Sequence, residues 1–589
     1  MKTIIQYLSE YVSEAFHVLG YGEFGNVVLS NRPDLCQFQC DDSFQAAKAN
    51  KKNPLIIAQE VSDVLKRSNS IFRSVNVSKP GFINMTLTDD ALSDFCFKMY
   101  EDTNLGIPIS DKSETIVLDY GGPNIAKPLH IGHLRSAIIG ESLKRLFKYY
   151  GYNVISDVHL GDWGLQMGLV IAEYQERYPE WSCFSDDFNP TTDNVPEINV
   201  DELNEIYPYA SAKSKNNDKF LSAAKRITFE LQNGNKGYIA LWNKIRKSSV
   251  SDLKKVYKFL SVDFDYWYGE SDAQKYIDIL VSNLEDKKML YESDGALVVS
   301  VSNESDKQVI PPVLIKKSDS SNLYATTDLA TIIQRRKDFN PNKIWYVVDA
   351  RQELHFEQVF RCAHKADLIS KDTQLQFLGF GTINGSDGKP YKTRDGGVMR
   401  LETFIEMVRY AVDKQIQNSN YITNITENER NELSLKIAIA AIKFGDLINH
   451  RSKNYIFDID KFLSFDGKTG TYLLYTISRI NSLLKKVNGS DVGTKRSITN
   501  YTEEERELVL NLVCTGDVFL KAINNKAPNI ICEHAYTVAS SFSKLYQRYN
   551  IIKETNLTRK NELINLVAIT RKFLILYLDL LGIEPVEYM

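Results

Sequence analysis

The chain lacks any long hydrophobic run. No stretch of its 589 residues approaches the length of a candidate membrane span, about 18 uninterrupted apolar residues. Its first residues, which include Glu10 and Glu14, have the spacing of an amphipathic helix rather than of a signal peptide. We therefore expect a protein that neither spans a membrane nor carries a secretion signal.

Cysteine is scarce and scattered. Among the 7 cysteines only Cys36 and Cys40 lie close together, and no second pair or histidine cluster completes the spacing of a zinc site. We expect no structural zinc and no other metal held by dedicated protein ligands. The same pattern favours a reducing, cytoplasmic location.

A surplus of positive charge is also missing. The 71 Lys and Arg residues are outnumbered by 75 Asp and Glu residues, which leaves a net charge of −4. A protein that binds nucleic acid over much of its surface is usually basic, so any RNA contact here must come from local patches. The hydrophobic content of 43% is ordinary for a globular protein, and the length suits several domains.

The middle of the chain alternates strands and helices. Apolar runs at 115–120, 153–158, 343–348 and 375–380 predict strands, and segments of helical periodicity lie between them. This alternation predicts a parallel sheet with helical crossovers over about 111–385, with an insertion at about 179–301. Such sheets bind ligands at the carboxyl ends of their strands, near the point where the strand order reverses.

The two ends of the chain have different patterns. Residues 1–110 predict a small α+β domain, and residues 386–455 a glycine-rich basic loop with connecting helices. The apolar positions of residues 456–589 recur at helical spacing, which predicts an all-α bundle. In the insertion, basic residues such as Lys244 and Arg246 could contact RNA or could form a solvated helix face.

His130-Ile131-Gly132-His133 joins the first of these strands to a helix. The free N–H groups and the positive dipole at a helix N-terminus attract anions, which suits a nucleotide phosphate. Gly132 leaves room for a ring or a phosphate beside the backbone. The alternative is that the two histidines only cap the helix or fill a cleft.

A second basic site lies in the glycine-rich loop. Lys389, Lys392 and Arg394 have glycines on both sides. Such a loop could close over a pyrophosphate, or it could be a basic turn that faces water. The histidines upstream favour the phosphate interpretation.

The sequence around the histidines resembles the first signature of class I aminoacyl-tRNA synthetases. Its flanks, Asn124 to Lys127 (NIAK) and His159 to Gln166 (HLGDWGLQ), are similar to those of arginyl-tRNA synthetases in particular. The similarity continues through LYATTDLA, DARQELHF, DGKPYKTR and TGTYLLYTISRI, so it spans most of the chain.

The resemblance implies a Rossmann-like α/β catalytic domain, an N-terminal α+β domain that contacts the tRNA elbow and a C-terminal anticodon-binding bundle. It implies an arginine–tRNA ligase that activates L-arginine with ATP, accompanied by Mg²⁺, and transfers it to the terminal ribose of tRNA(Arg). Members of that family generally need bound tRNA to form the adenylate, and we expect a monomer. The alternatives are a catalytically idle paralogue that binds tRNA and an unrelated nucleotidylyltransferase.

Charge indicates how arginine could be selected. A guanidinium is planar and permanently charged, so a selective pocket needs fixed carboxylates. Asp328 follows Tyr324 by four residues, on one face of a predicted helix, and Asp119 lies at a strand end. Asp328 could instead complement the dipole of its own helix.

The site residues can then be assigned by role. Catalysis falls to His130, His133, Lys127, Lys389 and Lys392. The expected contacts with ATP come from His130, Gly132, His133, His355 and Lys392. The resemblance implies that Asn124, His133, Tyr324, Asp328 and Gln352 contact arginine, and the charge argument adds Asp119.

The chain departs from the class I pattern at two places. Residues 389–394 (KPYKTR) keep the lysine spacing of the usual Lys-Met-Ser-Lys-Ser signature but little else, and the family suggests that Lys127 can share the work. Gly121 and Gly122 stand where the family more often has serine or alanine, so a hydroxyl contact from there is absent.

Overall fold

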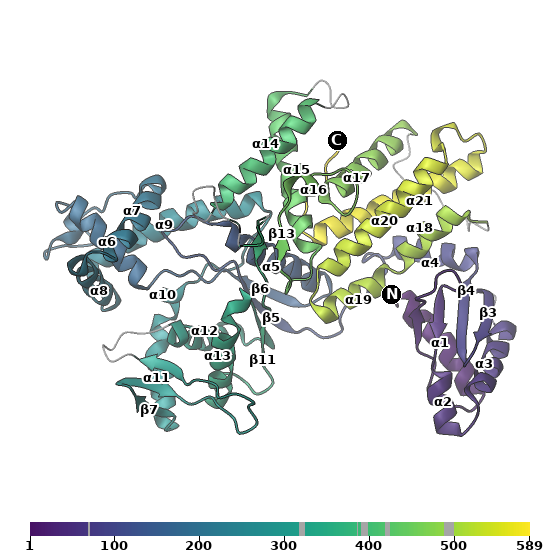
Figure 1. Cartoon of the computed structure of the whole chain (residues 1–589), viewed down its shortest axis with the longest axis horizontal. Helices are drawn as coiled ribbons and strands as arrows, with labels where there is room; N and C mark the ends of the chain where they lie inside the picture. The colour runs from purple at the N-terminus through teal and green to yellow at the C-terminus, as the bar shows by residue number, and fades with distance from the viewer. Residues whose placement is uncertain are drawn as a thin grey trace. The chain divides into compact units, whose positions relative to one another are not determined.

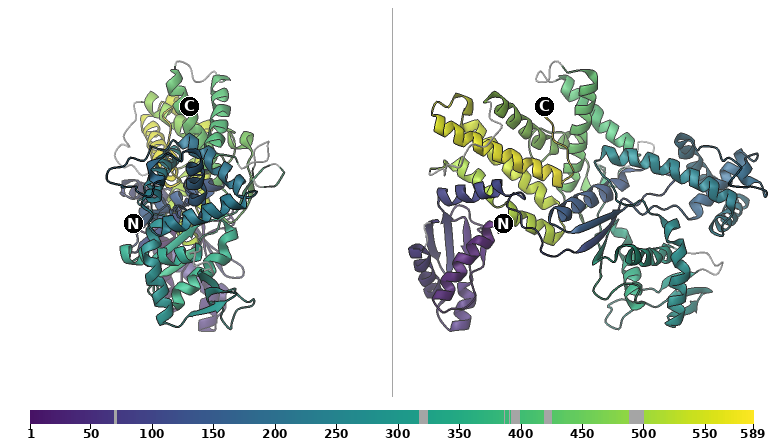
Figure 2. Two further views of the ribbon diagram at one scale, coloured as in Figure 1. Left: turned by 90° about the vertical axis from the view of Figure 1, so that its left-hand side faces the viewer. Right: turned by 180° about the vertical axis from the view of Figure 1, so that it is seen from behind.

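The computed structural model describes residues 1–68, 71–316, 324–385, 387–389, 391, 399–418, 425–487 and 500–589. Its ribbon is drawn from three directions in Figures 1 and 2. The chain divides into two compact units, of which one contains Lys112–Ser419 and Thr426–Phe462, and the other contains Met1–Asp111 and Leu463–Met589.

The first unit is built on a four-stranded parallel sheet in the order β11-β10-β5-β6. Its strands are β5 (Thr115–Tyr120), β6 (Asn153–Asp157), β10 (Lys343–Val347) and β11 (Gln374–Phe377). The predicted parallel sheet is therefore confirmed. The strand order reverses between β5 and β10, which are neighbours, so the crevice for a ligand lies beyond their carboxyl ends.

Helix α5 (Ile131–Tyr149) connects β5 to β6 and packs closely on the sheet. A Cβ atom at Gly140 would lie 2.2 Å from the Tyr120 ring, so this approach of helix to strand requires glycine. Helix α12 (Tyr324–Phe339) precedes β10, and the short η3 (Ala350–Gln352) and α13 (Glu353–Lys365) follow it. These connections bring the histidine motif and the residues after β10 to the same edge of the sheet.

The connection between β6 and β10 is long and contains two further groups of elements. One group is helical, and Figure 1 shows α6, α7, α8 and α9 clustered together. Its helices are α6 (Leu165–Arg177), η1 (Ser182–Phe184), α7 (Val200–Ser214), α8 (Asp218–Gln232) and α9 (Lys236–Phe259). The other group contains α10 (Glu270–Ala273), η2 (Gln274–Tyr276), α11 (Ile277–Asp286), β7 (Leu290–Ser293), β8 (Ala296–Val299) and β9 (Val313–Lys316).

The basic residues of α9 do more than form a solvated face. Arg246 Nε lies 2.9 Å from the buried Asp162 Oδ2, and Arg246 also contacts Asp272 at 3.2 Å. Lys254 Nζ stands 5.1 Å from the centroid of the Trp267 ring. Arg246 therefore joins α9 to the segment after β6, a structural role that neither sequence-based alternative included.

The rest of the first unit packs on the N-terminal end of α5, which carries the histidine motif. It comprises β12 (Ile383–Asn384), α14 (Leu401–Asn418), α15 (Glu427–Leu447), β13 (Tyr455–Ile456) and α16 (Ile459–Phe462). The buried Arg135 of α5 pairs with the buried Asp446 of α15, with 2.8 Å between Nε and Oδ1. Losing one partner of such a pair leaves an uncompensated charge in the core, so this contact fixes the two helices together.

The second unit combines an antiparallel sheet with a helical bundle. The sheet, in the order β1-β2-β4-β3, contains β1 (Val27–Leu29), β2 (Phe38–Cys40), β3 (Phe72–Ser78) and β4 (Phe82–Leu87). The helices beside it are α1 (Ile4–Val18), α2 (Ser43–Asn50), α3 (Pro54–Ser68) and α4 (Asp89–Glu101). The bundle contains α17 (Gly470–Lys486), α18 (Glu503–Val513), α19 (Thr515–Asn525), α20 (Asn529–Arg548), η4 (Ile551–Lys553) and α21 (Leu557–Leu580).

The predicted N-terminal domain and the predicted bundle lie in the same compact unit. Helix α4 packs against α18, and Arg506 of α18 pairs with Asp89 and also donates to the carbonyl of Leu87. The bundle part of the unit begins at Leu463, because residues up to Phe462 pack with the parallel-sheet unit. A sequence read segment by segment does not reveal such contacts between its distant ends.

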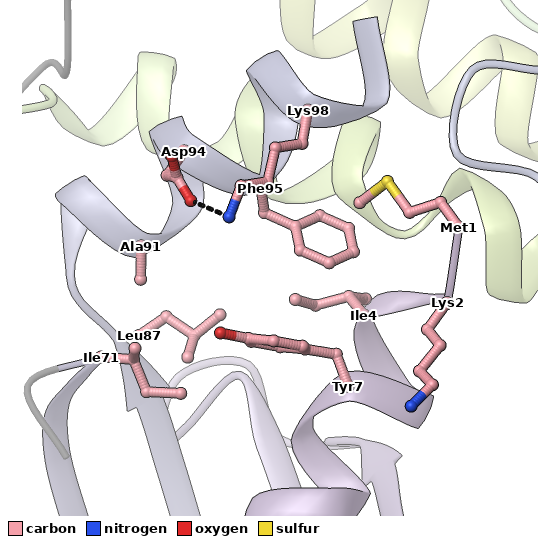
Figure 3. A pocket seen from close by; sticks show the side chains of 10 residues that line it. All are labelled: Met1, Lys2, Ile4, Tyr7, Ile71, Leu87, Ala91, Asp94, Phe95 and Lys98. Carbon is pink, nitrogen blue, oxygen red and sulfur yellow. Dashed lines mark ion pairs between the residues drawn. The ribbon is translucent and has the colours of Figure 1, made fainter. Parts of the chain in front are cut away.

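A cavity of about 430 Å³ lies within the second unit, beside α1 and α4. Figure 3 shows its mostly apolar lining, in which the rings of Tyr7 and Phe95 face the open space.

All seven cysteines are free and buried. Among the described residues, no helix is long and apolar enough to cross a membrane.

Candidate active site

The two signature histidines cap helix α5 reciprocally. His130 is the N-cap residue, and its Nδ1 accepts a hydrogen bond of 3.1 Å from the backbone N–H of Gly132. The Nδ1 of His133 accepts a bond of 3.1 Å from the backbone N–H of His130. The ring centroids are 3.8 Å apart. The capping alternative considered from the sequence is therefore correct as a description of the local structure.

Capping also fixes the chemistry of the two rings. A backbone N–H can only donate, so each Nδ1 must be unprotonated, and the proton of each neutral imidazole then sits on Nε2. Burial, together with the charges of His130 and Lys127, lowers the pKa of His133 to about 3. Burial and Lys127 also lower the pKa of His130. Near neutral pH, both rings are therefore uncharged and keep one N–H donor each.

Gly132 is required by the cap itself. A Cβ atom at this position would lie 2.8 Å from Cε1 and 2.9 Å from Nδ1 of the His130 ring. The sequence predicted room for a ring or a phosphate here. The approaching group in the structure is the ring of His130.

Ser136 links the ends of the two central strands to α5. Its Oγ accepts a bond of 2.8 Å from the N–H of Gly121, which follows β5, and donates one of 2.7 Å to the carbonyl of Val347, at the end of β10. Gln352 is exposed at the end of η3, and His355 lies in the first turn of α13. The predicted residues after β10 and the histidine motif thus flank the crevice where the strand order reverses.

Asp328 and His355 contact each other. The His355 Nε2 lies 2.6 Å from Asp328 Oδ2, and both side chains are partly exposed. Tyr324 stands one turn earlier on α12 and is 72% exposed. Asp328, which was predicted to bind arginine, is therefore paired with His355, which was predicted to bind ATP.

Asp119 has an internal partner. Arg335 of α12 places Nη2 2.6 Å from Asp119 Oδ2 and 2.7 Å from Asp157 Oδ2, and all three side chains are buried. Burial nevertheless raises the pKa of Asp119, against the effect of Arg335. The guanidinium beside Asp119 is therefore that of Arg335. A substrate arginine would have to compete with Arg335 for the Asp119 carboxylate, which the sequence did not indicate.

Glu270 is a partly buried carboxylate that the sequence analysis did not single out. It begins α10, and its N–H donates a bond of 3.0 Å to the carbonyl of Leu160. Burial raises its pKa to about 7, and its charged neighbours include Asp328. The charge of Glu270 also contributes to the raised pKa of Tyr324, after the effect of burial. Its segment has no recognisable motif, so no sequence signal could have placed it beside Tyr324 and Asp328.

The segment before the histidines is held by the helical insertion. Asn124 bridges to Gly161, with 3.0 Å between the Ile125 nitrogen and the Gly161 oxygen. Ala126 has a left-handed backbone with φ of 62°, and its N–H donates to Ser249 Oγ of α9 at 3.2 Å. Lys127 follows, with its charge close enough to lower the pKa of both signature histidines.

The basic loop is fixed at both ends beside this site. Before it, the N–H of Tyr391 donates to the carbonyl of Ile383 at 3.0 Å, and Lys389 is exposed. After it, the backbone pairs with the histidine motif, with a bond of 3.1 Å from the Ile131 N–H to the Met399 carbonyl. Lys392 and Arg394, which were predicted to bind phosphate, lie outside the described residues.

Three family models match successive parts of the chain. Residues 98–459 match the catalytic domain described as "tRNA synthetases class I (R)". Residues 473–589 match the DALR anticodon binding domain, and residues 2–87 match the arginyl tRNA synthetase N terminal domain.

Similar proteins and structures extend over the whole chain. The arginine–tRNA ligases of Alkaliphilus oremlandii and Agathobacter rectalis are 46% and 45% identical, each with 100% of both chains covered. The arginyl-tRNA synthetase structures from Plasmodium falciparum (24% identity, TM-score 0.80) and Thermus thermophilus (20%, 0.77) share its fold, also with 100% of both chains covered.

We expect both signature imidazoles to be neutral with the proton on Nε2. In ¹⁵N-histidine-labelled protein at pH 7, each should give one protonated and one unprotonated nitrogen, and His133 should stay neutral at about pH 5. His130→Asn and His133→Asn variants assign the signals. A signature histidine that titrates at about pH 6.5 or above, or carries its proton on Nδ1, would contradict the capping geometry.

Proposed function

The chain belongs to the arginyl-tRNA synthetase family and is an arginine–tRNA ligase, and from that premise we propose how its residues divide the reaction. The enzyme consumes ATP to attach L-arginine to tRNA. The observation that carries the assignment of roles is the pair of neutral, donor-oriented histidines at the crevice between β5 and β10.

In the first step, a carboxylate oxygen of arginine attacks the α-phosphorus of ATP. A new P–O bond forms, and the bond to the bridging oxygen breaks as pyrophosphate leaves. The enzyme needs no nucleophile of its own, but it must position both substrates and stabilise the charge on the phosphate oxygens. We assign this task to the Nε2–H groups of His130 and His133, supported by the N-terminal dipole of α5.

The departing pyrophosphate requires positive charge. Lys127, which adjoins the signature histidines, is the described residue best placed to supply it. Lys389 and Lys392 of the basic loop are proposed to add to it when ATP is bound. We propose that Mg²⁺ enters with the nucleotide, since phosphate and water oxygens are its usual ligands.

Arginine selection is assigned to a group of acidic and phenolic side chains. The charge of Asp328 helps to raise the pKa of Glu270, and the charge of Glu270 helps to raise that of Tyr324, in both cases after burial. Two carboxylates can bind the two edges of one guanidinium. A neutral amino acid in this pocket would leave those carboxylates unpaired, which explains selectivity. We propose that Asn124, Gln352 and His133 contact the other end of arginine, and we keep Asp119 as a supporting residue behind the pocket.

The contact between Asp328 and His355 gives the two substrates a physical connection. A guanidinium that pairs with Asp328 competes with His355 for the same carboxylate oxygen. Arginine binding then releases His355, which becomes available to the adenosine of ATP. This exchange supports the assignment of His355 to the nucleotide.

The remaining regions are proposed to hold the tRNA. We assign binding of the tRNA anticodon to the helical bundle at 473–589, and binding of the tRNA elbow to the N-terminal α+β part. In the second reaction step, arginine is transferred to the terminal ribose 2′-OH of the tRNA, and AMP is released. We further propose that the enzyme is a monomer. The seven free, buried cysteines support a cytoplasmic location.

Substitution of His130 can separate capping from catalysis. Asparagine keeps a side-chain oxygen that caps a helix but lacks the Nε2–H donor, whereas alanine loses both. We expect His130→Asn to lower arginylation of tRNA(Arg) by about 10²–10³ with little change in melting temperature. His130→Ala should lose activity and stability together. A His130→Asn enzyme with a normal single-turnover rate would refute the donor role.

Glu270 should make arginine binding depend on pH. Its pKa of about 7 means that it is partly protonated at neutral pH, and a bound guanidinium favours the ionised form. We therefore expect arginine affinity, measured by calorimetry, to fall below pH 7, by up to about tenfold per pH unit. Glu270→Gln should weaken arginine binding about 10- to 100-fold and flatten the pH dependence, while ATP affinity is kept.

Asp278→Asn, at an exposed position on α11, is the matched control and should leave both affinities unchanged. If Glu270→Gln binds arginine normally, the pocket has been assigned to the wrong carboxylate. Asp328→Asn is then the variant that decides whether guanidinium recognition lies on α12 at all.

Adenylate formation is proposed to depend on tRNA. The lysine loop, KPYKTR, departs from the usual class I signature, which supports a site that is completed when RNA binds. We expect arginine-dependent exchange between pyrophosphate and ATP only when tRNA(Arg) is present. Periodate-oxidised tRNA(Arg), which cannot accept arginine, isolates the activation step, and non-cognate tRNA is the control. Equal exchange without tRNA would refute the dependence but not the assignment of the enzyme.

A further inference from the structure

Lys127 is held by an aromatic ring. Its Nζ lies 4.7 Å from the centroid of the Tyr207 ring, within the range of a cation–π contact. Among the residues that the structure describes, no carboxylate forms an ion pair with Lys127. The lysine is only partly exposed, so the ring contact replaces part of the hydration that its ammonium group loses.

Tyr207 comes from the helical insertion. It lies on α7, directly before Pro208, and α7 packs against α6, which begins within the HLGDWGLQ segment. A second insertion helix, α9, accepts the backbone N–H of Ala126 through Ser249. The insertion therefore fixes both the backbone before Lys127 and the end of its side chain.

The position of Tyr207 connects two parts of the active site. Lys127 affects the pKa of both signature histidines, so it stands at the phosphate end of the site. The charge of Tyr207 also contributes to the raised pKa of Tyr324, after burial and the charge of Glu270. A residue of the insertion thus interacts with side chains that are assigned to both substrates.

A ring is suited to hold a lysine that must act on phosphate. A carboxylate in place of Tyr207 would neutralise the ammonium and would itself repel pyrophosphate. The face of a tyrosine attracts the cation through its quadrupole and leaves the full positive charge available. The contact is also weak enough for the lysine to move toward a phosphate when ATP arrives.

We propose that Tyr207 is a positioning residue of the activation reaction, which holds the ammonium of Lys127 beside the histidine motif for the β- and γ-phosphates of ATP. The proposal rests on the phosphate-binding role assigned to Lys127 above. It gives the insertion a direct part in ATP binding, in addition to its contacts with the backbone of the nucleotide fold.

Kinetics of arginylation with the full-length enzyme and tRNA(Arg) test the proposal. Tyr207→Leu removes the ring and should raise the KM for ATP about 3- to 10-fold, with a smaller change in the KM for arginine. Tyr207→Phe keeps the ring and should stay close to wild type. In a Lys127→Ala background, Tyr207→Leu should add little, because the charge that the ring holds is gone.

Tyr209→Leu is the matched control. Tyr209 lies two residues along the same helix and contacts the cations of Arg177 and Lys213, away from Lys127, so this variant should keep the wild-type KM for ATP. Melting temperatures check that each variant is folded, and Tyr207→Gln replaces Tyr207→Leu if the latter unfolds.

The outcomes separate this proposal from the one it rests on. A Lys127→Ala enzyme with normal kinetics would refute the role of Lys127 itself. An impaired Lys127→Ala enzyme beside a normal Tyr207→Leu enzyme would refute only the role of Tyr207. The role of Tyr207 would also be refuted if Tyr207→Phe were as defective as Tyr207→Leu. It would likewise be refuted if the KM for ATP of the double variant rose by the product of the increases in Lys127→Ala and Tyr207→Leu.

Discussion

The active site depends on the reciprocal cap at the start of α5. Two backbone N–H groups bind the Nδ1 atoms of His130 and His133. This arrangement ends the strand-to-helix turn, brings the two rings into contact and leaves each Nε2–H as a donor. Burial and the nearby charge of Lys127 then keep both rings neutral. Local helix chemistry thereby prepares a pair of donors before any substrate binds, so little reorganisation is needed in the transition state.

The other contacts of the catalytic unit keep this helix end in register with the sheet. Ser136 joins α5 to the ends of β5 and β10, and Arg335 ties α12 to Asp119 and Asp157. The basic loop returns to pair its backbone with Ile131. Residues from segments more than two hundred positions apart thus surround one crevice. Their side chains are held by buried ion pairs and hydrogen bonds.

The insertion contacts the segment that leads to the histidine motif. Ser249 accepts the backbone N–H of Ala126, and the ring of Tyr207 faces the ammonium of Lys127. These residues belong to no catalytic motif, because each acts through a contact that forms only when the chain is folded. A sequence therefore predicts the fold of this protein more completely than it predicts the contacts around the site.

The sequence by itself determined the parallel sheet, the position of the histidine motif at a helix start and the family to which the chain belongs. These features follow from hydrophobic period, from local helix chemistry and from contiguous motifs, all of which are written in neighbouring residues. Only the tertiary structure decided that Asp119 pairs with Arg335, that Asp328 contacts His355 and that burial raises the pKa of Glu270. The same holds for the packing of the N-terminal domain with the bundle. Charge pairing, burial and pKa depend on distances between residues that are remote along the chain, and those distances exist only after folding.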